Sequence, residues 1–196
     1  MPNKAMKERL AELLLEKSYK EGSFVLTSGK KSDYYFDCKQ TALHPEGSYL
    51  LGTLFVEMLK NRDIKGVGGM TLGADPLVSS VTVMSQVMSQ KDPEIRPLAG
   101  FIVRKKAKGH GTGQYLEGLA NFSRGDRVVL LEDVVTTGGT LVTTCERVRD
   151  EGLEIAAVCC VLDREEGGSE ILAEAGYKLE SIYTRRDLLS SGGRAS

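Results

Sequence analysis

Residues 128–140, VVLLEDVVTTGGT, join an apolar run to a loop of threonine and glycine. The run predicts a buried strand, and residues 141–149 predict the helix that follows it. Between them, residues 136–140 lie where free backbone N–H groups and the positive end of a helix can bind a phosphate. Glu132 and Asp133 stand directly before this loop, although carboxylates repel phosphate. The ligand is therefore expected to carry something besides phosphate.

The two acids suit a sugar. Carboxylates accept hydrogen bonds, and the vicinal hydroxyls of a ribose donate them. A ribose 5-phosphate could place its phosphate in the loop and its diol against the acids, which would also favour a developing positive charge on the sugar. The simpler alternative is an ordinary strand-to-helix turn with a capping side chain. The stretch is neither a Walker A loop, which needs a lysine after its glycines, nor a G-x-G-x-x-G turn.

Around this stretch, apolar runs alternate with helical patterns. The runs lie at residues 64–69, 98–104, 127–135, 154–163 and 179–184. Helical spacing is found near the N-terminus and at residues 45–61, 74–90, 138–152 and 167–176. This alternation predicts an α/β fold in which helices cover both faces of a parallel β-sheet. The carboxyl ends of the strands then lie on one rim, where such sheets bind their ligands.

The N-terminal part departs from this alternation. Two β-prone runs, 24–27 and 34–37, flank a Ser-Gly-Lys-Lys-Ser turn and predict a hairpin. We expect a small N-terminal hood, formed by about residues 1–40, over the rim of a single domain that spans residues 1–190. Residues 191–196 are rich in serine and glycine and predict a disordered tail.

Composition limits the partners. A formal net charge of −1 gives no general attraction to nucleic acid or to an anionic membrane, so neither is an expected partner. The N-terminus has no apolar stretch of signal-peptide type, and no run approaches the ~18 apolar residues of a membrane span. The cysteines have no metal-like spacing, and two of them are adjacent in the apolar run 154–163, which predicts buried free thiols. These features predict a cytoplasmic protein.

Two further motifs follow predicted strands. Residues 103–114, VRKKAKGHGTGQ, carry a cluster of cations followed by histidine and glycines, and predict a mobile lid that closes on a polyanion. A solvated charge run is the alternative. Residues 161–168, VLDREEGG, present Arg164, which could grip a carboxylate with two parallel hydrogen bonds. The alternative is a surface salt bridge to Glu165, Glu166 or another neighbour.

Together these motifs resemble those of the type I phosphoribosyltransferases, and most closely those of the orotate phosphoribosyltransferase family. Residues 128–140 look like the signature for phosphoribosyl diphosphate (PRPP), and residues 104–113 look like the catalytic loop. Residues 24–37, FVLTSGKKSDYYFD, resemble the N-terminal hairpin, and residues 161–168 resemble the base-binding strand end. The resemblance implies transfer of ribose 5-phosphate from PRPP to orotate, giving orotidine 5′-monophosphate (OMP) and pyrophosphate in pyrimidine biosynthesis.

The resemblance also implies roles for individual residues. The catalytic ones are Lys105, Lys108 and Asp133. Contacts to PRPP are expected from Arg104, Lys105, Lys108, His110, Glu132, Asp133, Val134, Val135, Thr136, Thr137, Gly138, Gly139 and Thr140. Contacts to orotate are expected from Thr136, from Arg164, and from the backbone near Tyr35 and Phe36.

The implied cofactor is Mg²⁺, held mainly by the diphosphate and not by a metal-binding cage of the protein. The implied assembly is a homodimer in which the 104–113 loop is shared across subunits. Many members have a lysine at the position of Thr27 and another in the loop that corresponds to residues 69–75, where this chain has none. Backbone N–H groups of residues 69–74 are expected to substitute there.

Two alternatives stay open. The first is a phosphoribosyltransferase for another base, although Arg164 and the hairpin favour a base that carries a carboxylate. The second is a non-catalytic, PRPP-sensing regulator. A regulator that binds nucleic acid would need a basic surface or an added DNA-binding domain, and the sequence predicts neither.

Overall fold

A computed structural model describes residues 4–25, 31–107 and 114–191. These residues form a six-stranded sheet, in the order β5-β4-β3-β6-β7-β8, and a separate two-stranded hairpin. The strands of the large sheet are β3 (Gly66–Met70), β4 (Ala99–Val103), β5 (Leu116–Glu117), β6 (Arg127–Val135), β7 (Glu154–Asp163) and β8 (Leu179–Thr184). The five longer strands are parallel, and they are the five apolar runs of the sequence. β5 pairs with β4 in the antiparallel direction at the edge of the sheet.

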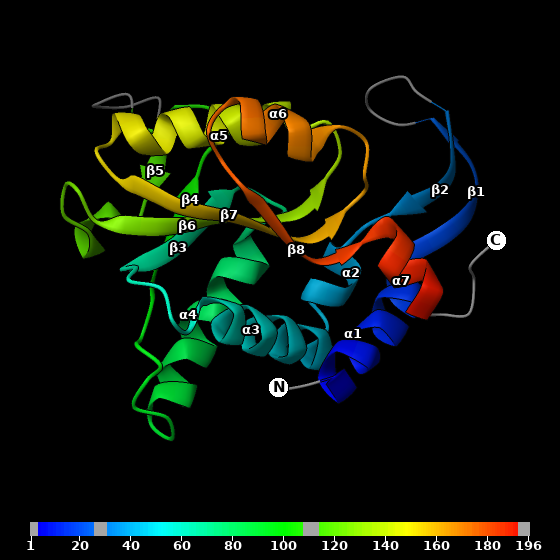
Figure 1. The fold of residues 1–196 in the computed structure, drawn as a ribbon, viewed down its shortest axis with the longest axis horizontal. Coiled ribbons are helices and arrows are strands. Elements are labelled where there is room, and N and C mark those ends of the chain that lie inside the picture. The colour runs from blue at the N-terminus through cyan, green and yellow to red at the C-terminus, as the bar shows by residue number, and fades with distance from the viewer. Residues whose placement is uncertain (1–3, 26–30, 108–113, 192–196) are drawn as a thin grey trace.

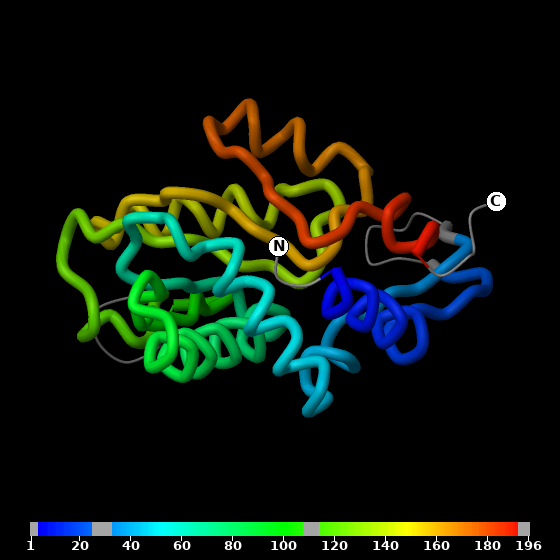
Figure 2. Tube along the Cα trace, turned by 60° about the horizontal axis from the view of Figure 1, so that its bottom comes forward, coloured from blue at the N-terminus to red at the C-terminus, as the bar shows by residue number. Residues whose placement is uncertain are grey.

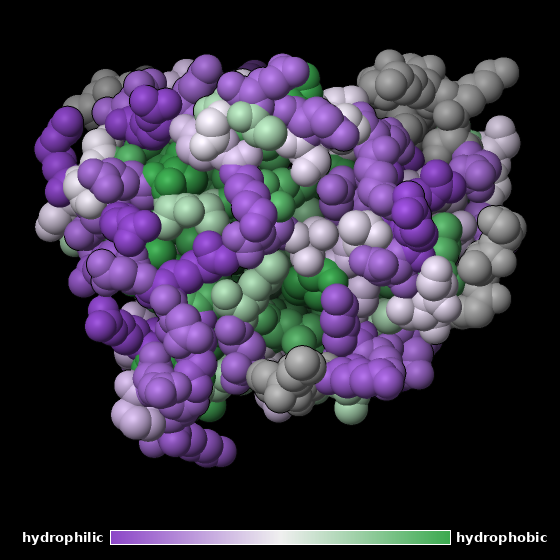
Figure 3. Space-filling view, viewed as in Figure 1, coloured by the Kyte–Doolittle hydropathy of each residue, from purple (hydrophilic) through white to green (hydrophobic). Residues whose placement is uncertain are grey.

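Helices cover both faces of this sheet, as the alternation predicts (Figure 1). One layer holds α3 (Pro45–Leu59) and α4 (Asp75–Ser89), and the other holds α5 (Gly139–Asp150) and α6 (Gly168–Glu174). Side chains of a strand alternate between the faces, so Val129 and Leu131 join one hydrophobic cluster while Val128 and Leu130 join the other. Figure 3 shows hydrophobic residues gathered between the two helix layers, where the sheet lies in the same view. The parallel α/β fold is therefore confirmed.

The N-terminal part forms a hood beside one end of the sheet. It consists of α1 (Lys4–Lys17), the hairpin strands β1 (Tyr19–Val25) and β2 (Lys31–Phe36), and α2 (Lys39–Ala42). The C-terminal helix α7 (Arg185–Ser191) packs against α1, so the first and last described helices lie side by side (Figure 2).

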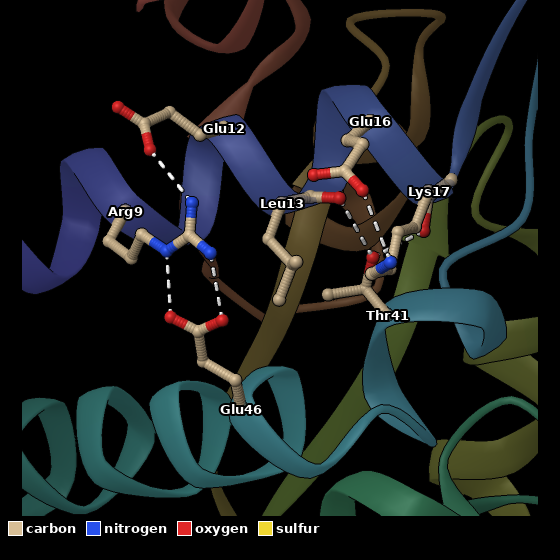
Figure 4. A network of polar contacts seen from close by, with 8 residues as sticks. Arg9, Glu12, Leu13, Glu16, Lys17, Thr41 and Glu46 are labelled. Atoms are coloured by element: carbon tan, nitrogen blue, oxygen red, sulfur yellow. Dashed lines mark hydrogen bonds and ion pairs between the residues drawn. The ribbon is translucent and has the colours of Figure 1, made fainter.

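Polar contacts fasten the hood to the rest of the fold (Figure 4). Arg9 of α1 binds Glu46 of α3 with two parallel hydrogen bonds of 2.7 and 2.9 Å. The hydroxyl of Thr41 lies 3.4 Å from the carbonyl of Leu13, to which it donates, and 2.7 Å from the hydroxyl of Ser18. Because α1, α2 and α3 are linked in this way, the hairpin between α1 and α2 is held in place relative to the sheet.

The predicted hairpin is present, but its first strand begins earlier in the sequence than the pattern predicts. β1 begins at Tyr19, which pairs with Phe36 of β2, whereas the sequence pattern predicts a start at Phe24. An irregularity between Glu21 and Phe24 interrupts the alternation of side chains, which hid the earlier residues. The turn that contains Thr27 lies outside the described residues.

The shortest elements were also missed. These are α2, β5, the 3₁₀ turn η1 (Leu119–Asn121) and α7. With four, two and three residues, α2, β5 and η1 are too short to show a helical or strand period in the sequence. The prediction of a disordered tail from residue 191 is wrong at its first residue, because Ser191 ends α7; the remainder lies outside the described residues.

The four cysteines are buried free thiols, as the sequence predicts. Cys159 and Cys160 lie in different hydrophobic clusters, on opposite faces of β7. Burial raises the pKa of the Cys159 thiol to about 12, so it stays neutral. Among the helices that the structure describes, none has the length and apolar character needed to cross a bilayer.

Candidate active site at the carboxyl ends of β6 and β7

The threonine and glycine loop lies between β6 and α5. Gly138, at the N-cap of α5, has a φ of 78°, which glycine adopts without strain. The loop and the end of β6 enclose a cavity of about 190 Å³, lined by Glu132, Val134, Val135, Thr136, Thr137, Gly138, Gly139, Thr140 and Leu141. The first N–H groups of a helix have no partner within it, so this cavity offers donors and the positive helix end to an anion. The structure therefore brings the predicted phosphate-binding residues together.

The two acids before the loop contact different neighbouring loops. Glu132 lines the cavity of the phosphate loop. Asp133 instead lies against the β3–α4 loop, where a β-carbon added to Gly73 would be 2.6 Å from its Oδ1 atom. The side chains of Glu132 and Asp133 also interact with each other, so the two acids form one cluster at the end of β6.

The pKa of the Glu132 carboxyl is well above its ordinary value. Burial is the largest cause, and the nearby charge of Asp133 adds to it. Lys105 lies close enough for its charge to oppose this rise, so the first residues of the basic loop face the same acids. A cationic ligand group, or a hydroxyl that donates a hydrogen bond, would therefore be favoured beside Glu132.

Lys39 of α2 is a site residue that the sequence did not reveal. Its Nζ atom lies 2.6 Å from Asp37 and 4.0 Å from Asp133. The hood thus places a cation beside one of the two acids, on the side that faces the β3–α4 loop. Lys39 and Asp133 are 94 positions apart, so only the folded chain brings them together.

The residues that flank the basic loop on its two sides lie next to each other. The N–H group of Arg104 donates to the carbonyl of Tyr115 at 2.7 Å, which joins the two ends. The guanidinium of Arg104 binds Glu117 at 2.8 Å, and Lys105 is exposed. Lys108 and His110 lie outside the described residues.

The 161–168 turn lies directly against the phosphate loop. The N–H group of Arg164 donates to the carbonyl of Val135 at 3.0 Å. A β-carbon on Gly138 would lie 2.9 Å from the carbonyl of Gly168, so glycine allows the two turns to approach. The structure therefore sets the guanidinium-bearing turn beside the phosphate-binding loop, on adjacent strands.

The Arg164 side chain is buried and not on the surface. It is 6% exposed, and its Nη2 atom lies 2.8 Å from Glu166. Its guanidinium also lies over the ring of Tyr34, at 4.4 Å from the centroid. The predicted salt-bridge alternative is right about this partner but wrong about the exposure. Beyond Tyr34 in β2, Tyr35 is exposed and Phe36 is buried.

Two backbone N–H groups of the β3–α4 loop are already hydrogen-bonded within the fold. The N–H group of Thr71 donates to the carbonyl of Val103 at 2.9 Å, and that of Ala74 donates to Met70 at 3.2 Å. These two donors of the 69–74 segment are engaged within the fold. These two N–H groups are therefore not available to substitute for the absent lysine, and substitution by the others of residues 69–74 stays a prediction. Lys39 supplies a charge nearby.

The described residues contain no group of three His, Cys, Asp or Glu side chains arranged to hold a metal ion. Two carboxylates at a strand end suit Mg²⁺, which keeps several waters and takes further oxygen ligands from a phosphorylated substrate. The residues present are thus compatible with a metal carried mainly by its substrate.

Comparison with known proteins gives a consistent result. The family described as the phosphoribosyl transferase domain matches residues 76–179. An orotate phosphoribosyltransferase of Nostoc sp. is 43% identical over 93% of this chain and 85% of its own length. One of Aquifex aeolicus is 42% identical over 93% of this chain and 97% of its own length.

Solved structures resemble the fold over nearly the whole chain. The orotate phosphoribosyltransferase of Mycobacterium tuberculosis in complex with PRPP has a TM-score of 0.74 at 32% identity, covering 93% of this chain and 98% of that one. The UMP synthase of Leishmania donovani has a TM-score of 0.78 at 26% identity, covering 97% of this chain and 39% of that one.

Proposed function

The chain belongs to the orotate phosphoribosyltransferase family, and we propose that the carboxyl ends of β6 and β7 form the site of its reaction. The enzyme transfers ribose 5-phosphate from PRPP to orotate, in pyrimidine biosynthesis, giving OMP and pyrophosphate. One observation supports this site above all others. The phosphate loop and the Arg164 turn are joined by the 3.0 Å hydrogen bond between Arg164 and Val135, so one ligand can reach both.

The phosphate loop is proposed to hold the 5-phosphate of PRPP. Its N–H groups and the threonine hydroxyls at 136, 137 and 140 would donate to the phosphate oxygens. Glu132 and Asp133 would accept hydrogen bonds from the ribose hydroxyls. Because the two acids lie close together at the end of β6, the vicinal hydroxyls of one ribose could donate to both. Val135 is buried, so it would contribute its backbone alone.

The transfer is proposed to need no protein nucleophile. Departure of pyrophosphate leaves positive charge at C1 of the sugar, which Glu132 and Asp133 would stabilise. Arg104, Lys105, Lys108 and His110 would offset the charge of the departing diphosphate and exclude water. Lys39 would add a cation on the side of the β3–α4 loop. Mg²⁺, when bound with the substrate, would supply charge neutralisation and orientation of the diphosphate.

The base is proposed to bind between the Arg164 turn and the hood. A planar guanidinium matches the carboxylate of orotate with two parallel hydrogen bonds. Thr136 and the backbone near Tyr35 and Phe36 would complete the contacts. Arg164 is buried against Tyr34, which supports a fixed position for this group. A neutral base would gain no such pair of hydrogen bonds from the guanidinium, which would keep its contact with Glu166.

A homodimer is also proposed. An apolar surface crosses α2, α3 and α4 and includes the exposed side chains Leu43, Tyr49, Leu72 and Val83. It encloses an open cavity of about 790 Å³ that reaches Lys39 and Asp75 beside the site. Exposed apolar surface of this kind is typical of protein interfaces. With a second copy seated there, the 104–113 loop is proposed to be shared across subunits, as the resemblance implies.

Sedimentation velocity tests the dimer. The wild-type protein is expected to sediment as a dimer, and Val83→Glu is expected to weaken that dimer because it places a charge in the interface. Ile171→Glu is the matched control, since Ile171 is an exposed apolar residue of α6, in the helix layer on the other face of the sheet. A wild-type monomer at micromolar concentration would contradict the proposal.

The proposed location is the cytoplasm, where thiols stay reduced, and the four free and buried thiols support it.

The function is tested by following the loss of orotate absorbance in a mixture of the protein, PRPP and Mg²⁺. Uracil, adenine and hypoxanthine serve as competing bases. We expect orotate to be consumed and the other three bases to be used far more slowly. Turnover of another base in its place, or PRPP binding without any turnover, would support one of the two alternatives.

A further inference from the structure

Arg164 and Glu166 form a pair with unequal burial. The two side chains are 2.8 Å apart, yet Arg164 is 6% exposed and Glu166 is 27% exposed. They are separated by one residue, Glu165, whose φ of 58° turns the chain so that both side chains meet. The cation of the pair is therefore enclosed, whereas the carboxylate keeps a route to solvent.

A buried guanidinium needs an anion nearby. Removing one partner of such a pair leaves an uncompensated buried charge, which is strongly unfavourable. Without substrate, Glu166 provides that charge to Arg164. In the proposed reaction the same guanidinium must bind the carboxylate of orotate. Two carboxylates cannot both occupy it without repulsion.

We propose that Glu166 is the resident counter-ion of Arg164, and that the carboxylate of the substrate displaces it into solvent. This inference rests on the proposed function, because it takes orotate as the ligand of Arg164. Glu166 then affects which bases bind. A base that carries a carboxylate can replace Glu166, whereas a neutral base leaves the resident pair intact and gains nothing from Arg164.

The surroundings keep Arg164 in place during such an exchange. Its guanidinium lies over the Tyr34 ring at 4.4 Å, and the guanidinium of Arg185 lies over the same ring at 4.6 Å. Tyr34 also stacks on Tyr19, with 5.5 Å between the ring centroids. Because the hairpin and α7 both contribute to this packing, only Glu166 has to move. Arg164 itself is expected to stay fixed.

The test is the binding of OMP to the free enzyme, measured by isothermal titration calorimetry. OMP carries the same carboxylate as orotate. Glu166→Gln keeps the shape of the side chain but removes the competing charge. We expect its dissociation constant for OMP to be about three- to tenfold lower than that of the wild type, the effect of removing one partly screened charge. The inhibition constant of uracil against orotate is not expected to fall.

Glu165→Gln is the matched control. Glu165 is adjacent in the chain, but it pairs with Arg186 at 3.4 Å. Its OMP affinity is expected to equal that of the wild type. A Glu166→Gln variant with unchanged or weaker OMP binding would overturn the exchange, and so would an equal gain in Glu165→Gln or a parallel gain for uracil. Wild-type protein that consumes no orotate would overturn the proposed function as well, which separates the two failures.

Discussion

Gly73 and Asp133 are in such close contact that a β-carbon on Gly73 would lie 2.6 Å from the carboxylate of Asp133. Real side chains do not tolerate that distance, so any larger residue at position 73 would turn the carboxylate away. The β3–α4 loop thus fixes the orientation of an acid that belongs to β6. This contact gives the loop a role in the site although it carries no lysine.

Gly73→Ala is therefore expected to act through Asp133. We expect kcat/KM for PRPP to fall by about 10- to 100-fold, the loss caused by misplacing a catalytic group by about 1 Å. The melting temperature should change little, because the loop lies at the surface. A double-mutant cycle with Asp133→Ala identifies the route. If Gly73→Ala costs as much without the Asp133 carboxylate as with it, the contact is not the cause.

Lys39→Met is expected to raise the KM for PRPP by about tenfold, which corresponds to about 1.4 kcal/mol and to the loss of one charged contact. Lys60→Met is the matched control. Lys60 also lies 2.6 Å from an aspartate, Asp92, but it follows α3 at the opposite end of the sheet. An equal KM for PRPP in the Lys39 variant and in the wild type would remove Lys39 from the site.

The basic loop provides its own comparison. Lys108→Ala is expected to lower kcat by about 100- to 1,000-fold, because a preorganised charge on the departing diphosphate would be lost. Lys106→Ala removes the same charge two positions away and is expected to have less than a threefold effect. Circular dichroism should show an intact fold in both variants. Equal losses would indicate a general effect of positive charge instead of a specific contact.

Glu132 links activity to stability. The pKa of its carboxyl is raised in the folded protein, so ionisation is harder there than in the unfolded chain. Below the ordinary pKa the carboxyl is protonated in both states and costs the folded protein no stability. Stability is lost as the pH rises through the raised pKa of the folded protein. Glu132→Gln avoids this loss. We expect its melting temperature to exceed that of the wild type by about 2–4 °C per kcal/mol relieved near pH 8, and by much less near pH 5.

Thermal unfolding across this pH range checks the prediction. A difference that stays constant with pH would show that the effect comes from packing and not from ionisation. A variant that is less stable than the wild type near pH 8 would contradict the raised pKa. Activity of the same variant should fall, because the neutral amide is a weaker acceptor for the ribose hydroxyls.

The sequence predicts the architecture well because its signals are local. The central strands β6 and β7 are nearly continuous apolar runs, and the phosphate loop lies within 13 consecutive residues, 128–140. The short elements α2 and β5 could not be predicted, since a four-residue helix and a two-residue strand are too short to show a period. The early part of β1 was hidden by its irregular pairing with β2.

Contacts between residues that are far apart in the chain could not be predicted from the sequence. Lys39 reaches Asp133 only after the hood has folded onto the sheet, and no spacing in the chain indicates it. The burial of Arg164 depends in the same way on Tyr34 in the hairpin. Both residue types were visible in the sequence, but their partners were not.

The central claim is that one ligand spans the phosphate loop and the Arg164 turn. A crystal structure of the protein with OMP tests it most directly. We predict the 5-phosphate within hydrogen-bonding distance of the N–H groups of residues 136–140, and the carboxylate of the base on the guanidinium of Arg164. OMP bound elsewhere, or bound with its base carboxylate away from Arg164, would contradict the account.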